Sequence, residues 1–173
     1  MKKILIILAI IISVIVINKE QEEETVIIPH NAIRFRVIAN SNTIEDQIIK
    51  NKISKNTEEY ISSLVSEAKT ASQTKEILID NKENINNYVQ NYMDINNIEE
   101  TFKISIGSNY FPNKKYKGVE YKEGYYDSVV IELGESSGLN WWCVIYPPLC
   151  KIDNVEEAEY TTLVGEILSN FDM

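Results

Sequence analysis

The sequence has 173 residues, is 44% hydrophobic and carries a formal net charge of −9. This length predicts one ordinary domain, and the apolar content can supply its core. The acidic balance excludes nucleic acid as a favourable partner, because a surface of this sign repels phosphates. We therefore expect a single domain over residues 25–173, preceded by a separate N-terminal segment.

That N-terminal segment has the pattern of an export signal. Lys2 and Lys3 precede an apolar run over residues 4–17, and an acidic stretch follows it. As a helix the run would measure about 21 Å at ~1.5 Å per residue, which is short of the ~30 Å hydrocarbon core but suits a signal peptide. No small-x-small cleavage site follows. Residues 1–24 are therefore either a cleaved signal peptide or a short anchor with an acidic linker, which would associate with the membrane, and the domain lies outside in both cases.

The domain is predicted to begin with a strand and a long helix. Over residues 33–39, apolar side chains alternate with Arg34 and Arg36. Thr43 has the chemistry of a helix N-cap, and Asp46 follows in the first turn. We expect a helix over residues 43–69. Its inward face is predicted to hold Ile44, Ile48, Ile53, Tyr60, Ile61, Leu64, Val65 and Ala68.

The middle of the chain alternates between helical and extended patterns. A second, weaker helical pattern covers residues 74–92, and its interior asparagines lower the helix propensity. Residues 102–107 alternate as a strand that ends at Gly107. The following residues, 108–124, are rich in loop signals, with a short edge strand near 116–121.

Two further strands are expected after this loop. Residues 125–133 place Val129, Ile131 and Leu133 on one face. Residues 134–138 predict a hairpin into an antiparallel neighbour at 140–146. The spacing over 155–171 is compatible with a C-terminal helix. Together the elements predict an α+β fold, with a mainly antiparallel sheet of about four strands and two long helices packed on one face.

Residues 140–150 hold both tryptophans, both cysteines and two of the four prolines. In a strand, Trp141, Cys143 and Ile145 share one side, whereas Trp142, Val144 and Tyr146 share the other. Both sides are apolar, which predicts a strand covered on both faces or one that offers a face to a partner. Pro147 and Pro148 end the strand, because proline cannot donate to a sheet ladder.

Two cysteines in an exported chain indicate a disulfide. A bridge between Cys143 and Cys150 closes an eight-residue ring, for which chain entropy gives about 2.5 kcal/mol. Two buried free thiols are the alternative. Two sulfurs and the single histidine, His30, leave a structural zinc site short of a ligand, so we expect no metal and no cofactor.

No catalytic motif is evident. A nucleophilic pair of His30 with Cys143 or Cys150 is conceivable, but no nucleophile elbow, phosphate loop or HExxH sequence is present. We therefore expect that the chain is not an enzyme. A secreted hydrolase that uses such a Cys/His pair remains the alternative.

The sequence NWWCVIYPPLC at residues 140–150 resembles the C-terminal signature of the stage II sporulation protein R family of endospore-forming bacteria. Residues 28–41, IPHNAIRFRVIANS, are similar to an upstream block of that family, and residues 111–112 and 124–126 match its middle. The resemblance covers roughly residues 26–152. It implies a secreted signalling protein, made in the forespore and exported to the intermembrane space. There it would activate a membrane-embedded aspartic protease of the mother cell, which cleaves an inactive sigma-factor precursor. A structural partner at the septal membrane is a further alternative.

The matched blocks contain the candidate partner-binding residues. Arg34 and Arg36, the only arginines, point the same way from one strand and could hold a partner's carboxylates, or could pair internally with helix carboxylates. Of Trp141 and Trp142, we expect one in the core and one nearer the surface as a contact anchor; two buried rings are the alternative. The remaining candidates are Asn40, Ser41, Tyr146, Pro147 and Pro148.

Overall fold

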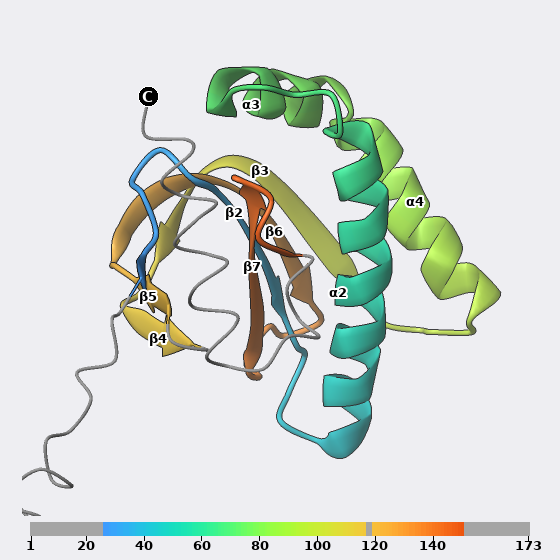
Figure 1. Ribbon diagram of the computed structural model, residues 1–173. Coiled ribbons are helices and arrows are strands. Elements are labelled where there is room, and N and C mark those ends of the chain that lie inside the picture. Colours follow the sequence, from blue (N-terminus) through green and yellow to red (C-terminus); the bar gives the residue numbers. More distant parts are fainter. Residues whose placement is uncertain (1–25, 117–118, 151–173) are drawn as a thin grey trace, which may run out of the picture.

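The strand β2 (Ile33–Ile38) lies inside a four-stranded sheet whose order is β3-β6-β2-β7. The computed structural model describes residues 26–116 and 119–150. Helices cover one face of this sheet, and a small second sheet lies on its other side (Figure 1). The predicted α+β architecture, with helices on one face of a mainly antiparallel sheet, is confirmed.

The outer pairs of the main sheet are antiparallel and the central pair is parallel. β3 (Phe102–Phe111) pairs antiparallel with β6 (Gly124–Leu133), and β7 (Asn140–Tyr146) pairs antiparallel with β2. β2 and β6 run parallel, with Phe35 opposite Val129. β2 is therefore hydrogen-bonded on both sides and anchors the sheet.

The predicted hairpin between residues 125–133 and 140–146 is wrong. β6 and β7 run antiparallel, but β2 lies between them. The six residues of the connection, 134–139, span two strand spacings, roughly 9.6 Å, across the end of β2. Gly138 crosses so close to the Ser41 carbonyl that a side chain at this position would have no room. Proximity in sequence suggested a pairing that the doubly bonded β2 occupies instead.

Three helices form the layer on one face: α2 (Ile44–Leu64), α3 (Ala71–Asp80) and α4 (Lys82–Ile95). Thr43 is the N-cap of α2, and its side chain accepts a hydrogen bond from the Asp46 amide, as predicted. The second helix predicted over residues 74–92 is in fact two helices that divide at Asn81. The side-chain amide and the backbone N–H of Asn81 both donate to the Ile77 carbonyl, at 2.9 and 3.0 Å, and the Asn81 carbonyl accepts from the Ile85 amide. Asn81 therefore ends α3 and begins α4.

The inward face of α2 differs from the prediction at its start. Ile53, Thr57 and Ile61 are buried, as a 3.6-residue period requires. Ile44 and Ile48 are exposed instead. They belong to a different stripe of the helix from Ile53, and this stripe faces away from the sheet.

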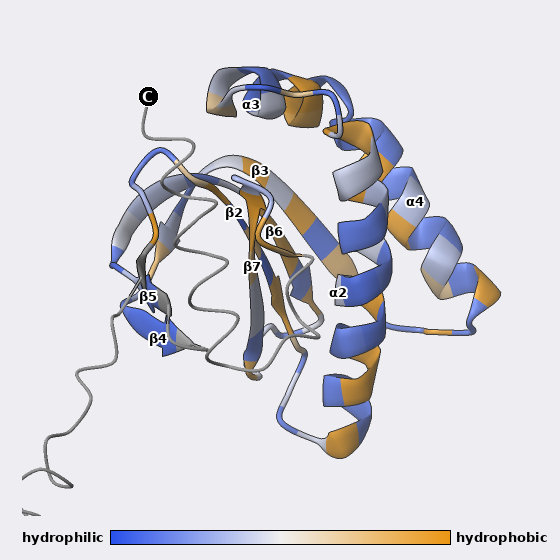
Figure 2. Ribbon diagram, in the orientation of Figure 1, coloured by the Kyte–Doolittle hydropathy of each residue, from blue (hydrophilic) through white to orange (hydrophobic). Residues whose placement is uncertain are grey.

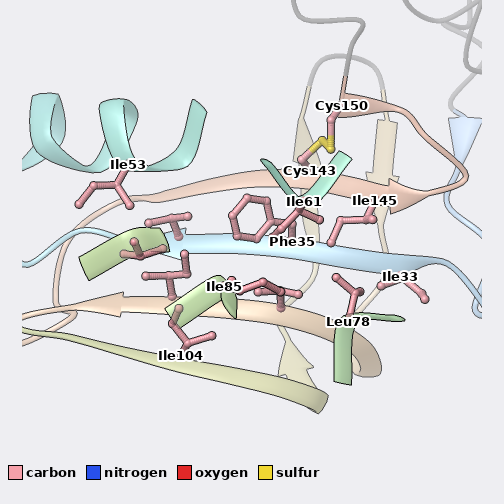
Figure 3. Packing of buried hydrophobic residues seen from close by; sticks show 14 of the residues in the cluster. Ile33, Phe35, Ile53, Ile61, Leu78, Ile85, Ile104, Cys143, Ile145 and Cys150 are labelled. Atoms are coloured by element: carbon pink, nitrogen blue, oxygen red, sulfur yellow. A yellow bond between two sulfur atoms is a disulfide. The ribbon is translucent and has the colours of Figure 1, made fainter. Parts of the chain in front are cut away.

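The main core lies between the helices and the sheet. Ile33, Phe35 and Val37 project from β2 toward the helices (Figure 3). The cluster also contains Ile53, Ile61, Leu78, Ile85, Val89, Met93, Ile104, Val129, Ile131, Leu133, Cys143, Ile145 and Cys150. The predicted strand alternation at β2 and β6 is therefore confirmed, because Val129, Ile131 and Leu133 all face this core.

A second, three-stranded sheet has the order β1-β5-β4. It consists of β1 (Val26–Ile27), β4 (Lys114–Tyr116) and β5 (Val119–Tyr121), with β1 and β5 parallel. The sequence predicted a single short edge strand near residues 116–121. The two strands that the sequence did not predict, β1 and β4, are two and three residues long, which is too short to show an alternation.

The predicted signal segment, residues 1–24, and the predicted C-terminal helix, residues 155–171, lie outside the described residues. Within residues 26–116 and 119–150, none of the helices combines the length and apolar character that a membrane crossing requires.

Candidate functional site

Arg34 and Arg36 project from β2 into an aromatic layer on the sheet face opposite the helices. The Arg34 guanidinium carbon lies 3.4 Å from the ring centroid of Tyr126 and 5.5 Å from that of Tyr121. The Arg36 guanidinium carbon lies 4.7 Å from the ring centroid of Phe111. A cation held over ring faces is attracted by the aromatic quadrupole. The two arginines therefore point the same way, as predicted, and each is stabilised by aromatic rings.

The side chain of Arg34 is fully buried, at 0% exposure. Its Nη1 donates to the Lys122 carbonyl at 3.3 Å, whereas Nε and Nη2 have no acceptor among the residues that the structure describes. Burial lowers the pKa of Arg34, and the neighbouring Tyr126 opposes that shift. An arginine keeps its proton under these conditions. Arg34 is thus a buried cation that depends mainly on aromatic faces.

Arg36 is only partly buried and is the more accessible of the pair. Burial lowers the pKa of its guanidinium, and the charge of Glu132 opposes the shift. The helices cover the other face of the sheet, so their carboxylates do not pair with either arginine. Arg36 is therefore the more accessible of the two for a partner's carboxylate, although its Nε is buried, whereas Arg34 is fully covered.

Asn40 joins the loop after β2 to the loop after β6, and Ser41 joins it to the start of α2. The Asn40 side-chain oxygen accepts a hydrogen bond from the backbone amide of Glu135 at 2.9 Å. The backbone carbonyl of Asn40 accepts from the Ser137 hydroxyl at 2.6 Å. The Ser41 hydroxyl donates to the Asp46 carboxylate, and the Asn40 amide donates to the same carboxylate at 3.3 Å. Asn40 therefore fixes the crossing of the 134–139 connection over the end of β2, and Ser41 anchors the same loop to α2.

We expect Ser41→Ala to raise the pKa of Asp46 toward its ordinary value. Asp46 has a lowered pKa, chiefly because the Ser41 hydroxyl stabilises the carboxylate. A lowered pKa contributes stability above the unfolded-state value of ~3.9, and this contribution is lost as the pH falls through the folded-state pKa. The variant should therefore lose less stability on acidification than the wild type.

Carboxyl carbon NMR titration measures the shift directly, and denaturant unfolding at two pH values measures the linkage. Ser66→Ala is the control, since its hydroxyl donates to the Ser63 carbonyl and not to Asp46. An unchanged Asp46 titration in the Ser41 variant would contradict the proposed hydrogen bond.

Trp141 and Trp142 leave β7 on opposite faces, as predicted. Trp142 is buried with Phe111, their ring centroids 5.4 Å apart. Trp141 lies on the helix side of the sheet and is partly exposed. Its ring centroid lies 5.4 Å from that of Phe35, in an edge-to-face arrangement. One ring therefore belongs to the arginine-bearing layer, and the other lies at the margin of the main core, on a strand at the edge of the sheet.

Tyr146 lies on a different side of β7 from the one predicted. The pairing of β2 with β7 shifts between Ile33 and Arg34, so that one extra residue of β7 is accommodated there. This bulge turns Tyr146 toward the core on the helix side, where its hydroxyl donates to the Lys69 carbonyl at 2.7 Å. Period-2 alternation cannot predict such a shift, because it assumes an uninterrupted strand.

The chain turns at Pro147 and Pro148 directly after β7, as predicted. Pro147 is buried and Pro148 is exposed. The disulfide between Cys143 and Cys150 closes this turn, with a Cα–Cα distance of 5.3 Å, and is visible above the core in Figure 3. The predicted bridge is therefore present, and it ties the turn to the middle of β7.

Removing the bridge should lower the free energy of unfolding by about 2.5 kcal/mol, the loop-closure value for an eight-residue ring. Cys143→Ala with Cys150→Ala tests this value without placing hydroxyl groups in a buried site. Urea denaturation measures the loss. Mass spectrometry of unreduced, alkylated wild type confirms that the bridge is present, and equal stability of oxidised and reduced wild type would contradict the prediction.

The comparisons with known proteins match the part of the chain that carries these features. The family model described as stage II sporulation protein R matches residues 29–156. The chain belongs to the stage II sporulation protein R family. Stage II sporulation protein R of Bacillus subtilis (strain 168) is 30% identical over 128 residues, which cover 74% of this chain. They cover 57% of that protein, so the chain spans little more than half the length of this curated relative. No solved structure matches the chain.

The region matched to the stage II sporulation protein R family includes every candidate residue, but the fold divides these residues among three places. Arg34, Arg36 and Trp142 share the aromatic layer. Asn40 and Ser41 lie at the loop crossing. Trp141 and the turn after β7 lie at the sheet edge, with Tyr146, Pro147, Pro148 and the disulfide. The candidates therefore form one continuous framework around β2 and β7 and do not form a single pocket.

The rings that enclose the arginines were not among the predicted site residues. Phe111, Tyr121 and Tyr126 come from three different strands, β3, β5 and β6. The density of aromatic residues between positions 110 and 126 was the available signal. Their convergence on Arg34 depends on how the two sheets pack, which no local spacing records.

Proposed function

We propose that this member of the stage II sporulation protein R family is an exported signalling protein. It activates a membrane-embedded aspartic protease of the mother cell by binding, and so triggers cleavage of an inactive sigma-factor precursor. The observation that carries the proposal is the family match over residues 29–156, which includes both the arginine strand and the tryptophan strand. Family membership itself supports a role in sporulation.

Activation in this proposal is a population shift. The chain binds the active arrangement of the protease more tightly than the inactive one, and its differential affinity sets the size of the response. A rigid ligand suits this task, because little binding energy is then lost in ordering it. The bridge from Cys143 to Cys150 and the hydrogen bonds of Asn40 provide such rigidity around β7.

Export is part of the same proposal. Lys2, Lys3 and the apolar run over residues 4–17 direct the chain out of the forespore into the intermembrane space, where it meets the protease. If the segment is retained, it holds the domain at the membrane surface that carries the protease. A structural partner at the septal membrane, the alternative, would have the same location. It would bind other proteins there without activating the protease.

The alternative of a secreted hydrolase requires a free thiolate. Both cysteine sulfurs of the chain are joined in the disulfide, so neither serves as a nucleophile in this form. His30 lies beside Tyr126, with ring centroids 5.0 Å apart, on the opposite side of the sheet from Cys143. A Cys/His pair is therefore not assembled by these residues.

Co-expression tests the proposal. The full chain, the candidate protease and the sigma-factor precursor are produced together in a host that lacks other sporulation proteins, and precursor cleavage is followed by immunoblot. We expect cleavage only when chain and protease are both present. Replacement of the protease's active-site aspartates is the control, and it should abolish cleavage. Cleavage by the chain without a working protease would indicate a hydrolase, and cleavage by the protease alone would contradict activation.

A further inference from the structure

The start of α2 and the end of α4 expose large aliphatic side chains at one end of the helical layer. Figure 2 shows hydrophobic colour at both places. Ile44 is 82% exposed, Ile48 is 49% exposed and Ile95 is 70% exposed. A single exposed isoleucine is ordinary, whereas several that lie together can mark an interaction site. This end of the molecule is therefore a candidate contact surface.

Of these residues, Ile44 and Ile48 line an open groove with a volume of about 650 Å³. Its apolar lining comes from Ile44, Ile48, Ile49 and Ile98. The groove forms where α4 ends: the Ile98 amide donates to the Met93 carbonyl at 2.9 Å, and Asn97 takes a left-handed conformation with φ of 52°. The chain then runs back toward α2 and β3 (Figure 1), and the groove lies between this segment and the first turns of α2. A groove of this size accommodates several aliphatic side chains.

The charge around this groove is mainly negative. Glu45 and Glu99 line it, against the single cation Lys52. Asp46 lies close enough to Glu100 to raise its pKa, after the larger effect of burial. The C-terminal end of α4 adds the negative pole of a helix, and its last turn contains no basic residue. The positive pole at the start of α2 also lies at the groove, but Glu45 and Asp46 in the first turn of α2 oppose it. The complementary ligand is therefore aliphatic with cationic neighbours, whereas an anionic lipid surface would be repelled.

We propose that this groove, lined by Ile44, Ile48, Ile49 and Ile98, binds an amphipathic segment of a partner protein. The segment places aliphatic side chains in the groove and lysine or arginine against Glu45 and Glu99. Such binding follows the helix-in-groove mode, in which apolar anchors recur on one face of a helix. The inference rests on the proposed function only for the identity of the partner, which would be the protease.

Peptide binding to the full-length chain tests the groove without the protease. The probe is a fluorescein-labelled amphipathic helix of leucine and lysine, and the matched probe has glutamate in place of lysine. Fluorescence anisotropy should show that the lysine peptide binds about tenfold more tightly than the glutamate peptide, because only the lysine peptide complements Glu45 and Glu99. Glu45→Gln with Glu99→Gln should weaken binding of the lysine peptide and reduce its dependence on salt.

The matched substitutions are Ile44→Ser with Ile48→Ser in the groove, and Ile79→Ser on α3. Ile79 is 49% exposed, as Ile48 is, and does not line the groove. Neither change alters net charge, so general attraction to a cationic peptide persists in both variants. The groove variant should raise the Kd of the lysine peptide about tenfold or more, whereas Ile79→Ser should leave it within about twofold. Circular dichroism should show unchanged folding, since the replaced side chains are exposed.

Equal affinities of the wild type and the groove variant would overturn the proposal. Two further results would also overturn it by assigning another occupant: flotation with phosphatidylcholine vesicles that the groove variant loses, or a dimer in sedimentation that the groove variant loses. Precursor cleavage by the groove variant separates the two proposals. If the groove variant loses peptide binding but still supports precursor cleavage, the groove is a binding site for a protein other than the protease.

Discussion

Replacing Trp142 by alanine should lower the free energy of unfolding by about 3–5 kcal/mol, the cost of removing a buried aromatic ring. Trp142 is enclosed by Phe111 and by Tyr121, whose ring centroid is 6.1 Å away, and Arg36 lies over its ring at 5.5 Å. Alanine would leave a cavity in the layer between the two sheets. The loss should therefore exceed that of the disulfide.

Trp141→Ala is the matched control, because it removes the same side chain from the neighbouring position of β7. Trp141 is partly exposed and contacts Phe35 edge-on, so its removal should cost clearly less stability. Under the proposed function it should weaken activation more than it weakens folding. Urea denaturation followed by far-UV circular dichroism avoids reliance on tryptophan fluorescence. Equal, large losses at both positions would show that Trp141 is also a core residue.

Arg34→Glu should destabilise the fold by about 3–5 kcal/mol, the cost of leaving an uncompensated charge in a buried site. The substitution replaces a cation over the faces of Tyr126, Tyr121 and Phe111 by an anion, which the same ring faces repel. Burial raises the pKa of the introduced carboxyl. A raised folded-state pKa means that the deficit is small in acid and grows as the pH rises above ~4.3, the ordinary value for this side chain.

Three companion substitutions separate charge from volume and from exposure. Arg34→Met keeps most of the volume without the charge and should cost less than the glutamate variant. Arg36→Glu should cost less as well, because Arg36 is only partly buried, and Lys114→Glu should cost little on an exposed strand. Urea denaturation at two pH values measures all four variants. Wild-type stability in the Arg34→Glu variant would show that the buried cation does not stabilise the aromatic layer.

Local sequence patterns predicted several features correctly because these features depend on neighbouring residues. The alternation at β2 and β6 follows from the two-residue period of a strand, and the N-cap of α2 follows from Thr43 itself. The bridge of Cys143 with Cys150 spans a short ring, so its partners were already close along the chain. The family was likewise predicted from short blocks of residues, which the family match contains.

Misread elements were those in which a distant segment competes with a local preference. Period alone could not decide which stripe of α2 faces the sheet, so Ile44 and Ile48 were assigned to the core although they border the open groove. Sequence proximity favoured pairing of β6 with β7, which β2 prevents.

The sequence by itself determined the fold class, the family, the strand that bears Arg34 and Arg36, and the disulfide at the end of β7. These depend on side-chain periodicity, residue chemistry and short separations along the chain. Only the tertiary structure decided that Arg34 is enclosed by rings from three strands, that β2 separates β6 from β7, and that the start of α2 borders a groove. The physical reason is that burial and strand order result from competition among all segments for the same core, and no local spacing records the outcome of that competition.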